Sequence, residues 1–187
     1  LHLCNKNFPN MNSKDSSKAK NDLLVDVCYA AIHEGESLVK QYEEHKKKEN
    51  TNFNTNICTV LARSFADIGD IVRGRDLFYG NPQEKDQRKK LEKNLKDIFA
   101  KIHGGLSKEK ISHYNGDTPD YYQLREDWWD ANRGTIWEAL TCEAPEHASY
   151  FRKTCNYDGT LSDAIHKCRC RDDQVPTYFD YVPQYLR

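Results

Sequence analysis

Seven cysteines are the residues of this chain with the clearest chemical potential. A catalytic or redox-sensing thiol usually occurs singly or as Cys-x-x-Cys, and a structural zinc site usually shows two closely spaced ligand pairs. The nearest metal-like group, His166 with Cys168 and Cys170, has no second pair. The pattern therefore favours disulfides in an oxidising compartment, and the odd count leads us to expect one partner beyond this sequence. The seven are Cys4, Cys28, Cys58, Cys142, Cys155, Cys168 and Cys170.

Two groups of basic residues are candidates for binding an anion. In the first, lysines recur at steps of three or four residues, which places them on one helix face as flexible point charges for sulfate or phosphate groups. The ordinary alternative is a solvated face, neutralised by the acidic residues between the lysines. The second group lies among the late cysteines, where disulfides would hold it as a display surface. The first comprises Lys85, Arg88, Lys89, Lys93, Lys96 and Lys101, with Lys90 alongside, and the second Arg152, Lys153, Lys167, Arg169 and Arg171.

Other polar and aromatic groups are better explained by folding than by catalysis. Asp67 and Asp70 lie three residues apart with arginines at 63, 73 and 75 close by, so we expect structural carboxylate–arginine pairs. The tryptophans at 128, 129 and 137 recur at helical spacing among apolar residues. Exposed rings would suit a sugar, but this spacing is more typical of a core.

No pattern in the chain predicts an enzyme or a cofactor. The seven histidines form no metal-binding pair at helical spacing, and there is no glycine-rich phosphate loop. A Cys–His nucleophile can assemble only in space, and we expect the thiols to be oxidised. We therefore predict a binding module without catalytic residues, metal or cofactor.

The elements that carry these residues read as long helices. The 187 residues have a mean hydropathy of −0.91 but 11% aromatic residues, which favours solvated helix faces over disorder. A net charge of −1 gives no reason to expect a nucleic-acid partner, and no apolar run approaches the roughly 20 residues of a spanning helix. Apolar residues at three- and four-residue steps predict helices over about 22–49, 56–72, 84–103 and 120–141. We also expect a loop over 1–20, a short helix near 161–168, a further helix starting within 178–187 and no strand, which makes an all-α bundle.

Seven stretches together resemble one family. They are LHLC at 1–4, VCYAA at 27–31 with EGE at 34–36, CTVLARSFADIGDI at 58–71, YYQLREDWW at 121–129, WEALTC at 137–142, CRC at 168–170 and VPTYFDYVPQYLR at 175–187. In this order they resemble the Duffy-binding-like domain, alpha class, of malaria-parasite erythrocyte membrane protein one. The resemblance covers the chain essentially from end to end.

The resemblance implies an all-helical, disulfide-stapled fold in three subdomains. Residues 1–20 would be the tail of the first subdomain with a connecting loop, and residues 21–187 a helical second subdomain that stops before the third. Cys4 would pair upstream of this sequence, and Cys58 would pair with Cys168 or Cys170. The remaining four cysteines would form two bridges of unassigned connectivity.

The resemblance also implies adhesion. The parent would be a variant surface antigen on the infected erythrocyte, held by a distant membrane anchor. Its partners would be a host-cell receptor, neighbouring domains of the parent chain and antibodies. The receptor would be a glycan such as heparan sulfate or a blood-group sugar, or complement receptor, in rosetting or cytoadherence. Two alternatives remain, namely an antigenic scaffold that supports a neighbouring receptor-binding domain, and a metal-dependent enzyme using His166, Cys168 and Cys170.

Overall fold

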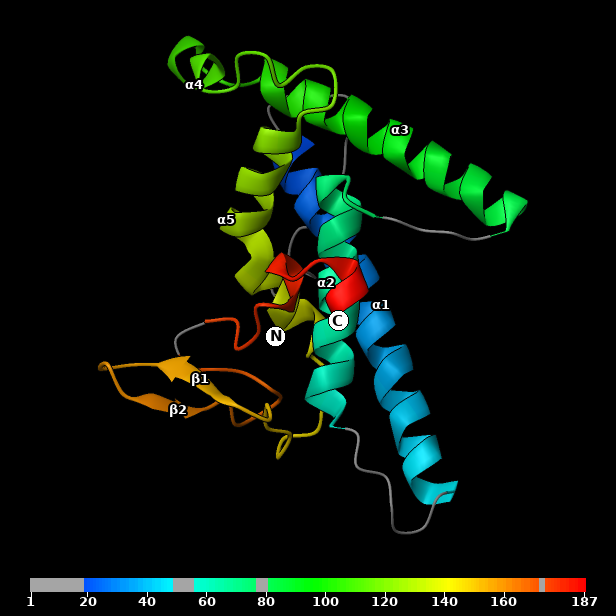
Figure 1. The fold of residues 1–187 in the computed structure, drawn as a ribbon, viewed down its shortest axis with the longest axis vertical. Helices are drawn as coiled ribbons and strands as arrows, with labels where there is room; N and C mark the ends of the chain where they lie inside the picture. Colours follow the sequence, from blue (N-terminus) through cyan, green and yellow to red (C-terminus); the bar gives the residue numbers. More distant parts are fainter. Residues whose placement is uncertain (1–18, 49–55, 77–80, 172–173) are drawn as a thin grey trace.

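Five helices form the body of the protein. A computed structural model describes residues 19–48, 56–76, 81–171 and 174–187. The helices are α1 (Ala19–Lys48), α2 (Ile57–Arg73), α3 (Pro82–Gly104), α4 (Lys108–Ser112) and α5 (Tyr122–Leu140). In Figure 1, α1, α2 and α5 run side by side, and α3 crosses one end of them. The mostly helical, disulfide-stapled fold and its four long helices are confirmed; the short α4 was not predicted.

The α2 helix is the centre of the bundle. Asn56 caps its start by accepting a hydrogen bond from the Cys58 backbone N–H at 2.8 Å. Phe65 is fully buried, with its ring centroid 5.1 Å from that of Trp129 and 5.2 Å from that of Trp137. A Cβ on Gly69 would lie 2.8 Å from the Trp129 ring, so this glycine lets α2 and α5 approach closely.

The three tryptophans belong to the core, as their spacing predicted. Trp128, Trp129 and Trp137 are 3%, 0% and 2% exposed, so none is a surface platform for a sugar. At the end of α5, a Cβ on Gly35 of α1 would lie 2.0 Å from the carbonyl oxygen of Leu140. Glycines therefore allow both α1 and α2 to approach α5 closely.

The segment after α5 corrects two predictions. Residues 153–163 form an antiparallel hairpin of β1 (Lys153–Asn156) and β2 (Leu161–Asp163), where we expected no strand. The prediction of a short helix near 161–168 is wrong, because β2 occupies the start of this segment and the backbone at its end is left-handed. His166, Lys167 and Cys168 have φ angles of 62°, 57° and 59°, which an α-helix cannot contain. The strands are too short for a readable alternation.

The last ten residues form two 3-10 turns rather than the start of a longer helix. These are η2 (Phe179–Tyr181) and η3 (Gln184–Leu186), separated by Val182 and Pro183. Pro183 has no backbone N–H, so it cannot continue the hydrogen-bond pattern begun at η2. The segment packs against α2 instead (Figure 1).

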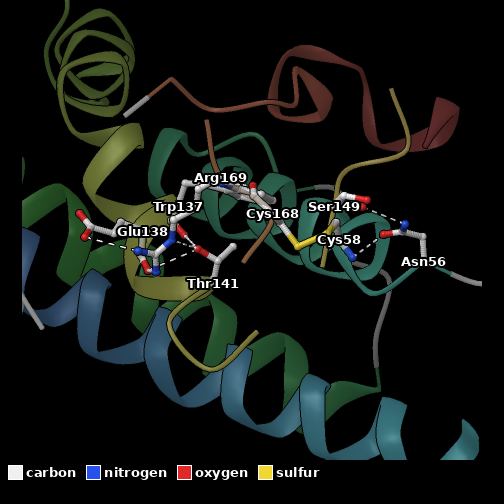
Figure 2. The surroundings of a disulfide bond; sticks show 8 residues. All are labelled: Asn56, Cys58, Trp137, Glu138, Thr141, Ser149, Cys168 and Arg169. Carbon is white, nitrogen blue, oxygen red and sulfur yellow. Dashed lines mark hydrogen bonds and ion pairs between the residues drawn. A yellow bond between two sulfur atoms is a disulfide. The ribbon is translucent and has the colours of Figure 1, made fainter. Parts of the chain in front are cut away.

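Two disulfides fix this second half of the chain to the helices. Cys58, at the start of α2, is bonded to Cys168, as the resemblance implied it would be to one of the two late cysteines. Figure 2 shows this bridge beside the Trp137 indole, whose Nε1 donates to the Cys168 carbonyl oxygen at 3.1 Å. The second disulfide joins Cys155 in β1 to Cys170.

The remaining cysteines depart from the expected pairing. Four cysteines were predicted to make two bridges, but only Cys155–Cys170 forms among them. Cys28 and Cys142 are buried and are not joined by a disulfide. Cys4 lies outside the described residues, as does most of the segment 1–20. The subdomain boundary placed at residue 20 therefore stays a prediction, with α1 beginning at Ala19.

Candidate anion-binding site

Arg125, on α5, fixes α3 to the rest of the bundle. Its guanidinium is fully buried and donates to both carboxylate oxygens of Glu92 in α3, at 2.7 and 2.9 Å. It also donates to the carbonyl oxygen of Val72, near the end of α2, at 2.6 Å. Position 74, beside this guanidinium, requires glycine. Its φ of 71° is left-handed, and a Cβ there would lie 2.9 Å from the Arg125 guanidinium. One charged side chain thus joins three helices.

A hollow of about 560 Å³ lies beside the Arg125–Glu92 pair, bounded by α3, the end of α2 and the start of α5. Four of the six residues predicted for the first basic group line it, namely Arg88, Lys89, Lys93 and Lys96. Tyr122, which is 52% exposed, adds an aromatic ring from α5. The apolar part of the lining comes from Ile71, Leu91 and Leu95. We call this hollow the cationic groove.

Carboxylates partly neutralise the cationic groove. Arg88 pairs with Asp76 at 3.4 Å, and Lys96 pairs with Asp120 at 2.5 Å. The hydrogen bond that Lys96 donates to the Asp120 carboxylate raises the pKa of Lys96, so this lysine stays charged. Burial raises the pKa of Asp76, and Arg88 opposes that shift.

The other two lysines of the groove are more available to a ligand. Lys89 is 79% exposed and reaches Asp86 only at 3.9 Å. Lys93 is exposed, and no carboxylate in the described part of the chain forms an ion pair with it. Lys85 and Lys101, the remaining predicted members, are exposed on α3 but do not line the groove, and neither does Lys90. The predicted face of basic residues is therefore present on α3, but only its middle part lines the groove.

The second basic group lies around the late cysteines, where Lys167, Arg169 and Arg171 line one small hollow. Lys167 donates to the Cys142 carbonyl oxygen at 2.8 Å and pairs with Glu146 at 3.4 Å. Arg169 donates to the Thr141 hydroxyl at 2.8 Å and to the Glu138 carbonyl oxygen at 2.6 Å (Figure 2). Both side chains thus hold the segment around the late cysteines in place. The three others, Arg152, Lys153 and Arg171, are exposed.

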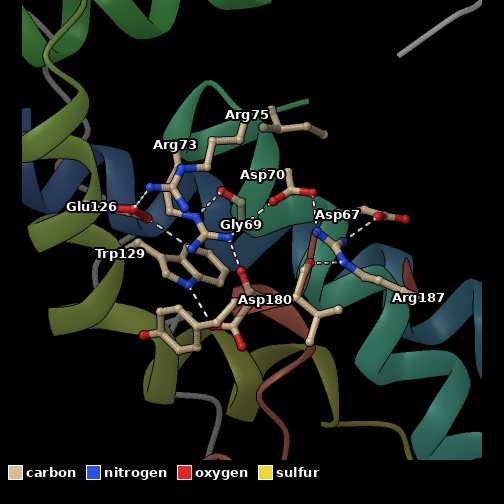
Figure 3. Close-up of polar contacts among 12 residues, drawn as sticks. Asp67, Gly69, Asp70, Arg73, Arg75, Glu126, Trp129, Asp180 and Arg187 are labelled. Carbon is tan, nitrogen blue, oxygen red and sulfur yellow. Dashed lines mark hydrogen bonds and ion pairs between the residues drawn. The ribbon is translucent and has the colours of Figure 1, made fainter. Parts of the chain in front are cut away.

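The aspartates of α2 belong to a buried ion network, as their proximity to arginine predicted (Figure 3). Arg73 is 1% exposed and pairs with Asp70 at 3.2 Å and with Glu126 of α5 at 3.0 Å. Arg187, at the far end of the chain, pairs with both Asp67 and Asp70. The network therefore holds the C-terminal segment against α2.

Asp180 extends this network into the core. It accepts hydrogen bonds from the Trp129 indole at 2.9 Å and, on its two carboxylate oxygens, from Arg133 at 2.8 Å each. Sequence reasoning missed Arg125 and Arg133. A readable signal existed, because each lies four residues from Trp129 on the apolar stripe of α5, where a charged residue must have a partner.

Comparison with known proteins identifies the family. The family described as Duffy binding domain matches residues 1–187. The chain belongs to the Duffy binding domain family. Among curated proteins, it is 24% identical over 144 residues to the Duffy receptor beta form of Plasmodium knowlesi and 25% identical over 145 residues to the Duffy receptor of Plasmodium vivax (strain Salvador I). These alignments cover 73% and 74% of the chain, but only 10% and 11% of those receptors.

Solved Duffy binding domains share the fold at higher identity. The chain is 48% identical to the NTS-DBL1(alpha-1) domain of Plasmodium falciparum membrane protein 1 (PfEMP1) from the varO strain, with a TM-score of 0.70. That match covers 88% of the chain and 35% of the solved protein. A PfEMP1 DBLbeta domain solved bound to ICAM-1 is 32% identical with a TM-score of 0.61, over 96% of the chain and 39% of that protein. The predicted resemblance is thus confirmed.

The metal-enzyme alternative is contradicted by the sulfur chemistry of this Duffy binding domain. Cys168 and Cys170 are both in disulfides, so neither is available as a thiolate ligand beside His166. Within the described residues, no group of three or more His, Cys, Asp or Glu side chains is placed to hold a metal ion. In the same residues, no helix has the length and apolar character to cross a membrane.

Proposed function

We propose that this Duffy binding domain is a receptor-binding adhesion module whose cationic groove engages an anionic glycan, such as heparan sulfate, on host cells. The observation that carries the proposal is the convergence of Arg88, Lys89, Lys93 and Lys96 beside the exposed Tyr122 ring. Lysines on flexible stems suit sulfate and carboxylate groups, and an aromatic ring beside them offers a face to a sugar ring. The parent protein would act from the surface of the infected erythrocyte.

Two features of the comparisons support receptor binding in general. The PfEMP1 DBLbeta domain is solved as a complex with ICAM-1, so a domain of this fold binds a host protein there. Both curated relatives are Duffy receptors. The glycan itself is proposed only from the charge and shape of the cationic groove.

The test compares two triple variants that remove the same charge. K89A/K93A/K96A removes three groove lysines, and K46A/K47A/K48A removes three exposed lysines at the end of α1. Each is assayed for binding to uninfected erythrocytes, with and without soluble heparin, at low and high salt. Because exposed ion pairs contribute up to about 1 kcal/mol each, we expect the groove variant to bind about tenfold more weakly or worse, and the α1 variant to bind normally.

Each other outcome has a defined meaning. Equal losses in both variants would show that binding follows net charge rather than the groove. Normal binding by the groove variant would place the site elsewhere. Binding that is insensitive to heparin and to salt would indicate a protein receptor or a neutral glycan, since charge-driven contacts weaken with salt. A complete absence of binding by the native protein would favour the scaffold alternative.

A further inference from the structure

The loop between α4 and α5 contains an asparagine that is placed to react with its own backbone. Asn115 is followed by Gly116, and both residues are exposed. A Cβ on Gly116 would have no neighbouring atom within 4 Å, so the loop is open to solvent at this point. Asn115 is the only asparagine of the sequence that a glycine follows. Because glycine has no side chain, nothing crowds the backbone nitrogen that follows the Asn115 side chain.

The reaction open to such a pair is deamidation, and asparagine is among the residues that are lost in this way on heating. The backbone nitrogen of Gly116 gives up its proton and attacks Cγ of Asn115. A new C–N bond closes a succinimide ring, and the side-chain amide leaves as ammonia. Water then opens the ring at either carbonyl, which gives aspartate or isoaspartate. Water is the only co-reactant, and either product carries a negative charge that asparagine lacks.

The structure leaves the attacking nitrogen available. Within the described part of the chain, neither the backbone N–H of Gly116 nor the side chain of Asn115 forms a hydrogen bond. The exposed Asp158–Gly159 pair, in the turn between β1 and β2, is different. Its glycine N–H donates to Oδ1 of Asn156 at 2.8 Å. Both glycines have a left-handed φ, 83° at Gly116 and 76° at Gly159, so the hydrogen bond is the main difference between the two turns.

The start of α5 depends on the residue that follows this pair. Both carboxylate oxygens of Asp117 accept hydrogen bonds, one from the Gln123 backbone N–H and one from that of Leu124, each at 2.9 Å. These N–H groups lie in the first turn of α5, where a helix supplies no partner of its own. The backbone N–H of Asp117 donates to the Tyr114 carbonyl oxygen at 3.1 Å, across the reactive pair. In isoaspartate the main chain runs through the side-chain carbon, so this turn becomes one atom longer.

We propose that Asn115 and Gly116 form a site of spontaneous deamidation, and that isoaspartate at position 115 releases the Asp117 cap from the start of α5. The fraction of converted protein rises with the age of the molecule. Converted protein has an additional negative charge in this loop and a looser first turn of α5. The proposal does not rest on glycan binding, because both of its readouts are properties of the chain itself.

The first measurement is the rate of conversion. The oxidised protein is kept at body temperature and mildly alkaline pH, where the amide nitrogen is more readily deprotonated. Peptide mass spectrometry counts the replacement of the amide by a carboxylate, and chromatography separates aspartate from isoaspartate. The matched control is D158N, which creates an asparagine–glycine pair whose glycine N–H is already hydrogen-bonded. We expect Asn115 to convert about tenfold faster than the D158N site, because opening an ordinary hydrogen bond lowers the population of free amide by about this factor.

The second measurement is amide hydrogen exchange in the converted protein. We expect the amides of Gln123 and Leu124 to exchange about tenfold faster than in fresh protein, since each loses one ordinary hydrogen bond, while those of α2 do not change. N115Q, kept under the same conditions, should retain slow exchange, because its longer side chain closes a ring far less readily. N115D should also retain it, since this variant adds the charge without lengthening the main chain.

Two results would overturn the proposal. If Asn115 stays intact, or converts no faster than the D158N site, the loop does not favour the reaction. If isoaspartate forms while the amides of Gln123 and Leu124 exchange as slowly as in fresh protein, the Asp117 cap does not depend on the length of this turn.

Discussion

Buried arginines hold the helices of this domain together at the level of single residues. Arg73, Arg125 and Arg133 are 1%, 0% and 15% exposed at their side chains, and each pairs with a carboxylate from another helix or from the C-terminal segment. A buried charge of this kind adds little compared with an apolar side chain of the same size, but it is costly to leave without its partner. These residues therefore set which surfaces meet.

Arg125→Ala should be among the most damaging single changes outside the apolar core. It removes the side chain that joins Glu92 of α3 to the Val72 carbonyl oxygen. Because breaking a buried pair leaves an uncompensated charge, we expect a loss of about 3–5 kcal/mol in the free energy of unfolding. Urea denaturation measures this loss. Arg152→Ala, which removes an exposed arginine over the Phe151 ring, should change stability by less than about 0.5 kcal/mol. Similar losses of unfolding free energy in the two variants would contradict the role of Arg125 in joining α3 to the other helices.

At the scale of elements, close approach of helices depends on glycine. Gly69 in α2 faces the Trp129 ring of α5, whereas a Cβ added to Gly104, at the end of α3, would have no neighbouring atom within 4 Å. These two glycines therefore provide a matched test of whether α2 and α5 are as tightly packed as the structure shows.

We expect Gly69→Ala to lower the free energy of unfolding by about 1–3 kcal/mol, because the buried indole must move to accommodate the methyl group. Gly104→Ala should leave stability unchanged or raise it by up to about 1 kcal/mol, since alanine is the better helix former. Thermal and urea denaturation of both variants measure the difference. Gly69→Ala without a cost would mean that α5 can shift away from α2.

Some of these elements could be predicted from the sequence and others could not. The four long helices were predicted to within a few residues, because each has an apolar stripe of at least four turns. The hairpin was not, since β1 and β2 have only four and three residues and their positions depend on the Cys155–Cys170 disulfide. For the cationic groove, spacing located the lysines of α3. It did not show that Tyr122 lies beside them, because that depends on how Arg125 sets α3 on α5.

At the scale of the whole molecule, the two disulfides close loops of very different length. The Cys58–Cys168 bridge spans 110 residues and joins the helices to the late segment, whereas Cys155–Cys170 spans 15 and closes one hairpin. The conformational freedom that a bridge removes from the unfolded chain grows with the length of the loop that it closes.

Removing each bridge should reveal this difference. Loop-closure entropy assigns about 3 kcal/mol to a 15-residue loop and about 4.7 kcal/mol to one of 100 residues. We therefore expect C58A/C168A to lose about 1–2 kcal/mol more in unfolding free energy than C155A/C170A, as measured by urea denaturation. A larger loss from the hairpin bridge would show that local geometry, rather than chain entropy, dominates.

The proposed binding of an anionic glycan in the cationic groove is tested most directly by ¹³C-labelled reductive methylation of the lysines, followed by NMR titration with a heparin-derived oligosaccharide. We predict that the resonances of Lys89, Lys93 and Lys96 shift with a common affinity, while those of Lys46, Lys47 and Lys48 do not. Shifts confined to lysines outside α3, or equal small shifts at every lysine, would contradict the claim.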